Sequence, residues 1–335
     1  MAGLEAAVDL DKAGYSKEYL ATLAAGLAWL DGFLVRCGLR LGKDDEVSKV
    51  DDVLSEVVQR AWEAKARLYL VVHAVLGVQK RFRISGSLLR CTWRRVEGWR
   101  MLKGGRSRIP LTRYLLQGLV VVAFGFAATC LEVAERERWW SAGLAWWLGF
   151  DALMRPGEVL ALRVADLVFP QGGGECDPGV VVVIRAPKTR RVWRAQFVLV
   201  EDVTLVAWLK WWCQGRAGGE KVFKISMQWW AKALKAACAA LGVGHVGYTL
   251  GSLRSGGATN HFRRHRNIGY LQYLGRWRSA RTLESYLHEA YATMTAGTLP
   301  AEAAANLNEV HHYVHWLVSP PQVSVRMWLG RVGRA

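Results

Sequence analysis

The sequence predicts a mainly α-helical protein of two domains, with one small β hairpin or sheet in the second domain. Its 335 residues exceed one ordinary domain and suit two of roughly 100–200 residues each. Over most of the chain apolar residues recur every three or four positions, as they do on one face of an amphipathic helix. The stretch near 180–200 instead has the β-branched runs and alternation of strands.

The first hundred residues predict four helices, at 17–37, 46–63, 66–80 and 86–102. In the first of them leucines stand at spacings of three and four, at Leu20, Leu23, Leu27, Leu30 and Leu34. Residues 103–110 contain two glycines and a proline, which stop helices. We therefore expect a helical domain at 1–102 and a linker at 103–110.

After the linker the pattern predicts helices at 112–134 and 138–151, followed by a hairpin of strands at 180–184 and 192–200. Helices are expected again at 202–214, 226–241, 251–266, 267–275 and 279–293. A second, mixed α+β domain thus covers 111–296. Residues 297–335 form a C-terminal helix and tail, with 301–317 helical.

Charge and cysteine usage narrow the class of protein. The chain has 45 Lys and Arg against 28 Asp and Glu, a net charge of +17, which favours a polyanionic partner such as nucleic acid or an acidic membrane face. Residues 80–113 hold eleven bases against Glu97 alone. Six scattered cysteines without a CxxC pair indicate a reduced intracellular protein and no zinc site.

No signal peptide or membrane span is expected from the sequence. The N-terminal stretch is acidic and lacks an apolar core. The longest uncharged apolar run, at 118–131, is shorter than the ~20 residues that cross a bilayer.

Four short segments contain candidate site residues. Arg155 precedes Pro156, which suits the first position of a helix, and Glu158 follows one turn later. Lys188 falls at the predicted hairpin tip, close to Arg190 and Arg191. The segment 249–259 is a helix of small residues around Arg254, and Gly275-Arg276-Trp277 precedes Tyr286. Taken singly, each segment also has a plain reading, such as a surface arginine, a polar turn or a half-buried tyrosine.

The order of these residues resembles the tyrosine recombinase (phage integrase) family, and in particular its members in eukaryotic genomes and mobile elements. The motif-level resemblance covers about 107–292, while 1–102 matches the family's helical core-binding domain in outline. It implies an integrase-like catalytic domain at 111–296. It also implies five catalytic residues, which are Arg155, Lys188, Arg254, Trp277 and Tyr286, with Glu158 in support.

The family's chemistry breaks and rejoins DNA, for recombination or integration, without a metal or other cofactor. Tyr286 would form a 3′-phosphotyrosyl bond, and the two arginines would hold the phosphate oxygens bidentately. Trp277 would donate a further hydrogen bond from its indole N–H, and Lys188 would protonate the leaving 5′ oxygen. One position departs from the family, because Gly251 stands where a histidine is usual. Either His245, Ser252 or water substitutes for it, or the site is weakened.

Double-stranded DNA is the expected partner, bound by a homo-oligomer that is a tetramer on paired sites. The DNA-binding residues predicted from basic segments are Arg90, Arg94, Arg95, Arg190, Arg191 and Arg276. Trp93 and Trp99, beside the first three, are more typical of a core. The segment 301–317 has an apolar stripe from Leu307 to Leu317. The resemblance implies that this C-terminal helix docks on a neighbouring copy, as it often does in the family. The histidine pairs at 261/265 and 311/315 lack a third ligand, so no metal is expected.

Three other readings stay open. A recombinase remnant would bind DNA without cutting it, and Gly251 favours this reading. A type IB topoisomerase-like enzyme would relax DNA as a monomer. In the last reading, the protein is helical and its matches to the family motifs arise by chance. DNA as substrate places the protein inside the cell, in a nucleus or nucleoid.

Overall fold

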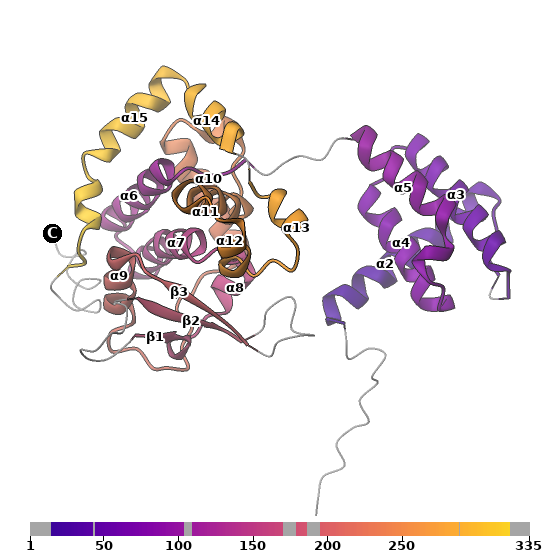
Figure 1. Ribbon diagram of the computed structural model, residues 1–335, viewed down its shortest axis with the longest axis horizontal. Helices are drawn as coiled ribbons and strands as arrows, with labels where there is room; N and C mark the ends of the chain where they lie inside the picture. The colour runs from indigo at the N-terminus through magenta and orange to yellow at the C-terminus, as the bar shows by residue number, and fades with distance from the viewer. Residues whose placement is uncertain are drawn as a thin grey trace, which may run out of the picture. The chain divides into compact units, whose positions relative to one another are not determined.

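The computed structural model describes residues 15–42, 44–103, 109–169, 179–185, 195–287 and 289–321. The chain divides into two compact units, Met1–Arg106 and Ser107–Ala335, which we describe separately. Among the described residues both units are mainly helical, and the second contains a small antiparallel sheet (Figure 1). The predicted fold class is therefore confirmed.

The first unit consists of four α-helices and a short 3₁₀ turn. These are α2 (Lys17–Cys37), α3 (Val47–Glu63), α4 (Leu68–Phe82), η1 (Gly86–Leu88) and α5 (Arg90–Lys103). α2 packs along α4, and α3 packs along α5. The apolar stripe that the sequence showed on α2 is buried at Leu23, Leu30 and Leu34. α2 is also long and apolar enough to span a membrane, but in this unit it buries that stripe against protein.

The start of α5 is held by Asp51 of α3. Its carboxylate accepts hydrogen bonds from the backbone N–H groups of Cys91 and Thr92, both at 2.9 Å, and from the Thr92 hydroxyl at 2.7 Å. These bonds satisfy donors that a helix N-terminus leaves free, and they hold the pKa of Asp51 below its usual value despite its burial. On α5, Trp99 is buried and Trp93 packs against the same core.

The second unit is built around α7 (Val133–Asp151), which lies in the middle of the other helices in Figure 1. Every residue from Trp140 to Phe150 is buried, which is typical of a helix surrounded by protein. The helices that follow in sequence order are α8 (Pro156–Ala161), α9 (Val203–Cys213), α10 (Met227–Ala240), α11 (Leu250–His265), α12 (Ile268–Leu274), α13 (Ala280–Glu284), α14 (Glu289–Gly297) and α15 (Ala301–His311). α6 (Arg113–Thr129) precedes α7 and packs along it. Short 3₁₀ turns are η2 (Val164–Asp166), η3 (Gly244–Val246) and η4 (Val314–Leu317).

The sheet has three antiparallel strands in the order β1 (Leu167–Val168), β2 (Val180–Ile184) and β3 (Gln196–Val200). Val182 of β2 lies opposite Leu167 on one side and Val198 on the other. These three side chains are buried on one face. β1 was not predicted from the sequence. The predicted hairpin tip, with Lys188, Arg190 and Arg191, lies outside the described residues.

One C-terminal expectation needs correction. The helix predicted at 279–293 is interrupted, because α13 ends at Glu284 and turn hydrogen bonds follow at Tyr286 and Leu287. In the single chain, Leu307 and Leu317 of the C-terminal apolar stripe belong to the core around α6 and α7; docking on a neighbouring copy stays a prediction. The His311 ring stacks on Tyr114 of α6 at 3.5 Å between ring centroids.

Candidate active site

The first part of the site is the corner between α7 and α8. Leu153 follows the end of α7 with a positive φ of 49°, and this turn reverses the chain toward Arg155. Arg155 is the N-cap of α8, and Pro156 takes the first helical position. The Arg155 backbone N–H donates to Glu158 Oε2 at 2.9 Å, and Arg155 Nη1 donates to Glu158 Oε1 at 2.6 Å. Glu158 thus fixes both the backbone and the side chain of Arg155.

The second part is Arg254, which α11 brings against this corner. α11 packs on α7 very closely, since a Cβ added at Gly257 would lie 2.0 Å from the Phe150 carbonyl oxygen. Only small residues permit this approach, as the sequence suggested. The Arg254 side chain is 2% exposed. Its Nη1 donates to the Leu153 carbonyl and its Nη2 to the Gly275 carbonyl, both at 2.6 Å.

The third part is the turn after α12. Backbone bonds from Arg276 to Tyr273 and from Trp277 to Gln272 close the helix end, with Arg276 in the left-handed region at φ 58°. The Trp277 ring folds back over Gly275, where an added Cβ would lie 1.5 Å from a ring carbon. This glycine is therefore required for the observed position of the indole.

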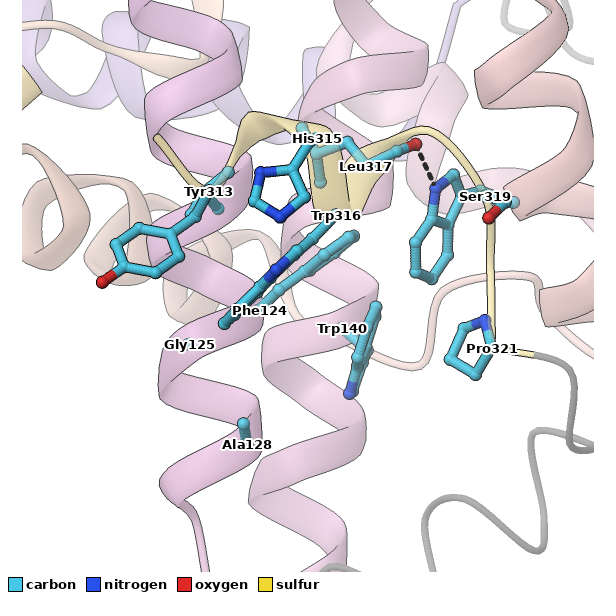
Figure 2. A pocket seen from close by; sticks show the side chains of 12 residues that line it. Phe124, Gly125, Ala128, Trp140, Tyr313, His315, Trp316, Leu317, Ser319 and Pro321 are labelled. Atoms are coloured by element: carbon cyan, nitrogen blue, oxygen red, sulfur yellow. Dashed lines mark hydrogen bonds between the residues drawn. The ribbon is translucent and has the colours of Figure 1, made fainter. Parts of the chain in front are cut away.

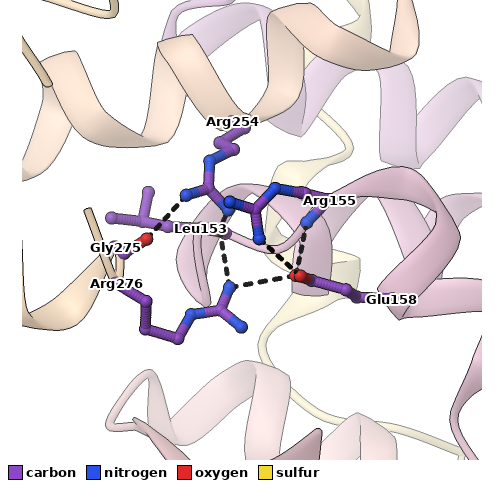
Figure 3. Close-up of polar contacts among 6 residues, drawn as sticks. All are labelled: Leu153, Arg155, Glu158, Arg254, Gly275 and Arg276. Carbon is purple, nitrogen blue, oxygen red and sulfur yellow. Dashed lines mark hydrogen bonds and ion pairs between the residues drawn. The ribbon is translucent and has the colours of Figure 1, made fainter. Parts of the chain in front are cut away.

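Arg276 joins these parts together. Its Nη2 donates to Glu158 Oε2 and to the Leu153 carbonyl, both at 3.1 Å. Figure 3 shows Arg155 and Arg276 bonded to the Glu158 carboxylate, and Arg254 bonded to the backbone carbonyls of Leu153 and Gly275 beside them. The cluster has three positive charges and one negative charge.

Burial and the neighbouring charges shift the pKa values of Arg254, Arg276 and Glu158. Burial, with a smaller contribution from the neighbouring Arg155 and Arg276, lowers the pKa of Arg254 to about 9. Burial also lowers the pKa of Arg276. The pKa of Glu158 is lowered despite its burial, because Arg276 and Arg155 stabilise the carboxylate. A buried cation with this surplus of like charges favours an anion.

Tyr286 lies beside the cluster. Its ring centroid is 5.1 Å from that of Trp277, and the Arg254 guanidinium carbon lies 5.7 Å from the Tyr286 ring and 4.5 Å from the Trp277 ring. The Thr259 hydroxyl donates to the Tyr286 carbonyl at 3.3 Å. The tyrosine is half-buried. Its ring lies near the Arg254 guanidinium and also packs against the apolar cluster that contains Leu153, Trp277 and Leu283.

The structure therefore brings together five residues from three of the four sequence segments: Arg155, Glu158, Arg254, Trp277 and Tyr286. Lys188, which the resemblance adds to them, lies outside the described residues.

Gly251 lies in the first turn of α11. Ser252 is one of the two side chains expected to substitute for a histidine at this position. Its hydroxyl oxygen accepts a hydrogen bond from the Thr249 backbone N–H, and the residue is 2% exposed. His245 is exposed in η3.

The residues expected to contact DNA occupy different environments. On α5, Arg90 and Arg94 are exposed, whereas Arg95 donates to the Ser55 carbonyl at 2.9 Å and forms an ion pair with Glu56. The side chain of Arg276 is only 7% exposed, so it points into the cluster and not toward solvent. The sequence did not indicate this inward position, nor the role of the Leu153 carbonyl as a shared acceptor.

A cavity of about 420 Å³ lies elsewhere in this unit (Figure 2). It is lined mainly by aromatic and apolar side chains of α6, α7, α9 and residues 313–321, with Phe124, Trp140 and Trp316 prominent. Trp208 Nε1 donates to the Leu317 carbonyl at 2.8 Å and closes one side. The arginine cluster takes no part in this cavity.

Comparisons with known proteins place the fold. No protein-family model matches the chain, and no curated protein matches its sequence. Among solved structures, the XerH site-specific recombinase in a post-cleavage complex with palindromic difH substrate has 12% identity and a TM-score of 0.53, over 87% of this chain and 80% of that chain. A lambda integrase dimer bound to a COC′ core site has 14% identity and a TM-score of 0.51, over 84% and 74% respectively.

These neighbours are tyrosine recombinases. The resemblance to that family predicted from the sequence is therefore confirmed at the level of the fold, which this chain shares with XerH and lambda integrase.

Proposed function

We propose that this protein breaks and rejoins double-stranded DNA through a covalent bond between Tyr286 and a 3′ phosphate. One observation carries the proposal: a half-buried phenol lies beside buried guanidiniums whose positive charge exceeds that of the single carboxylate among them. A phosphodiester supplies the missing negative charge. Storing the bond energy in a phosphotyrosine explains rejoining without ATP.

In the proposed reaction, the Tyr286 oxygen attacks the phosphorus and loses its proton, and the bond from phosphorus to the 5′ oxygen breaks. Arg155 and Arg254 stabilise the charge that develops on the non-bridging oxygens, and Trp277 donates a further hydrogen bond. Lys188 gives a proton to the leaving 5′ oxygen. Attack by another 5′ hydroxyl reverses these steps and rejoins the strand. No metal or other cofactor enters the scheme.

The first unit acts in this proposal as the core-binding domain, and the second as the catalytic domain. The exposed Arg90 and Arg94 of α5 contact the phosphate backbone, so affinity falls steeply with salt. Recombination or integration requires paired sites, and hence a homo-oligomer, a tetramer by analogy with the family. The compartment is the nucleus or nucleoid, where the DNA is.

The test is to trap the covalent intermediate on DNA. Wild-type protein and Tyr286→Phe are incubated with a pool of nicked duplexes of random sequence and denatured in SDS. We expect a DNA adduct with the wild type only. Equal yields from both proteins would remove Tyr286 from its role.

A second function, DNA binding without cleavage, is favoured by Gly251, which supplies no side-chain donor. Salt-sensitive binding by the wild type without any adduct would support that function and contradict cleavage. Relaxation of supercoiled plasmid by a monomer would instead support a type IB topoisomerase-like reaction.

A further inference from the structure

Arg276 occupies a backbone conformation that disfavours an arginine. With φ at 58° it follows the end of α12, at a position where glycine is preferred because it has no Cβ to clash. Leu153 has the same left-handed conformation after α7, with φ at 49°. Both residues contribute to the arginine cluster, so the strained backbone is found where the charges gather. Strain of this kind is often retained at functional sites.

The Arg276 side chain is also incompletely satisfied. Nη2 makes its two bonds, to Glu158 and to the Leu153 carbonyl. Nε and Nη1 are buried and have no hydrogen-bond partner among the described residues, and the same is true of Arg254 Nε. Buried donors without acceptors are costly. Two neighbouring guanidiniums thus hold unused N–H groups in one cluster.

Glu158 cannot neutralise the cluster by itself. Its Oε1 accepts from Arg155 at 2.6 Å and its Oε2 from Arg276 at 3.1 Å, while Arg254 bonds only to backbone carbonyls. One carboxylate therefore faces three guanidiniums. The cluster has a surplus of two positive charges, and two of its three guanidiniums, Arg254 and Arg276, are buried. This surplus matches a phosphate group that gains negative charge as it reacts.

We propose that Arg276 is a third anion-binding guanidinium of this site, with its Nε and Nη1 groups donating to oxygens of the DNA phosphate attacked by Tyr286. The inference rests on the proposed function and assigns Arg276 to the reacting phosphate, not to the flanking DNA backbone. Arg276 also keeps Glu158 in place through its third N–H group, so it both binds the anion and orders the pocket. Lysine cannot replace this fork of donors.

The test compares wild type with Arg276→Gly, Arg276→Lys and a control, Arg278→Met. Glycine suits the left-handed backbone, so Arg276→Gly removes the guanidinium and keeps the turn. Arg278 is an exposed arginine two residues away. Each protein is assayed for adduct formation on nicked duplexes with a normal phosphodiester, and on the same duplexes with a neutral methylphosphonate at the cleaved position.

On the phosphodiester, Arg276→Gly should slow adduct formation on the order of 10²–10³-fold, and Arg276→Lys should recover part of that loss. The methylphosphonate is neutral before attack and has one non-bridging oxygen fewer, so less negative charge develops for Arg276 to stabilise. On this substrate the loss should shrink to about 10-fold or less. Added guanidinium ion should partly rescue Arg276→Gly on the phosphodiester. An equal loss on both substrates would show a purely structural role and overturn the proposal.

A second measurement does not depend on cleavage. Inorganic sulfate should raise the melting temperatures of wild type and Arg278→Met by binding the arginine cluster. The midpoint, which is the sulfate concentration that gives half of this stabilisation, should be about 10-fold or more higher for Arg276→Gly. Midpoints equal to that of the wild type would overturn the proposal. If the wild type forms no adduct, the proposed function fails, and the sulfate midpoints alone decide the role of Arg276.

Discussion

Glu158→Gln tests how much of the second unit's stability depends on the only carboxylate in the arginine cluster. The Glu158 side chain is 5% exposed. Its carboxylate accepts hydrogen bonds from the Arg155 backbone, the Arg155 side chain and Arg276, at 2.6–3.1 Å. Glutamine keeps the size but replaces one acceptor oxygen with an NH₂ group that faces donors. Removing one partner of a buried ion pair costs about 3–5 kcal/mol, so we expect the unfolding free energy to fall by about that amount.

For a domain of roughly 150–250 residues, this loss lowers the melting temperature by about 6–20 °C. Thermal unfolding followed by circular dichroism measures it, with Glu302→Gln, at an exposed position on α15, as the control. Sulfate should restore part of the stability of Glu158→Gln, because it supplies negative charge to the same guanidiniums. A loss under about 1 kcal/mol, with no response to sulfate, would refute the reasoning.

Three further predictions concern stability and alignment. Gly275→Ala should lower the free energy of unfolding by about 1–3 kcal/mol and slow adduct formation about 100-fold, because the new Cβ displaces the Trp277 ring. The control is Gly269→Ala, where the nearest atom to an added Cβ is 3.4 Å away. Equal adduct kinetics for the two variants would contradict this prediction. Asp51→Ala should destabilise the first unit by about 2–3 kcal/mol, since the start of α5 loses three bonds; a change below about 0.5 kcal/mol in urea unfolding would argue against it. Burial raises the pKa of Asp151 from 3.8 to about 6, so its neutral form favours folding below about pH 4, and this contribution is lost as pH rises through about 6. Between pH 4 and pH 7, the free energy of unfolding of the wild type should therefore fall by about 2–3 kcal/mol more than that of Asp151→Asn. If the unfolding free energies of both proteins change with pH in parallel, the prediction is wrong.

The helices and the main strand pair were predictable because their burial follows a regular period. The leucine stripe of α2 and the alternation of β2 and β3 are examples. β1 has two residues, too few to show any period. The interruption before Tyr286 was not predicted, because it depends on turn bonds after α13 that leave no mark in the hydrophobic pattern.

The grouping of Arg155, Arg254, Trp277 and Tyr286 followed from the order of motifs, and the corner at Pro156 explained how Arg155 and Glu158 pair. The inward position of Arg276 could not be predicted in this way. It depends on a left-handed backbone after α12, which an arginine in the sequence does not indicate. The shared acceptor is the backbone carbonyl of Leu153, a group that every residue possesses.

The most direct test of the central claim is to locate the covalent DNA bond by mass spectrometry. The trapped adduct is digested with nuclease and trypsin, which cleaves after Arg281 and releases a peptide that contains Tyr286, Tyr291 and Tyr313. We predict a 3′-nucleotide mass on Tyr286, located by fragmentation. A nucleotide on Tyr291, on Tyr313 or on any other residue would contradict the proposed site.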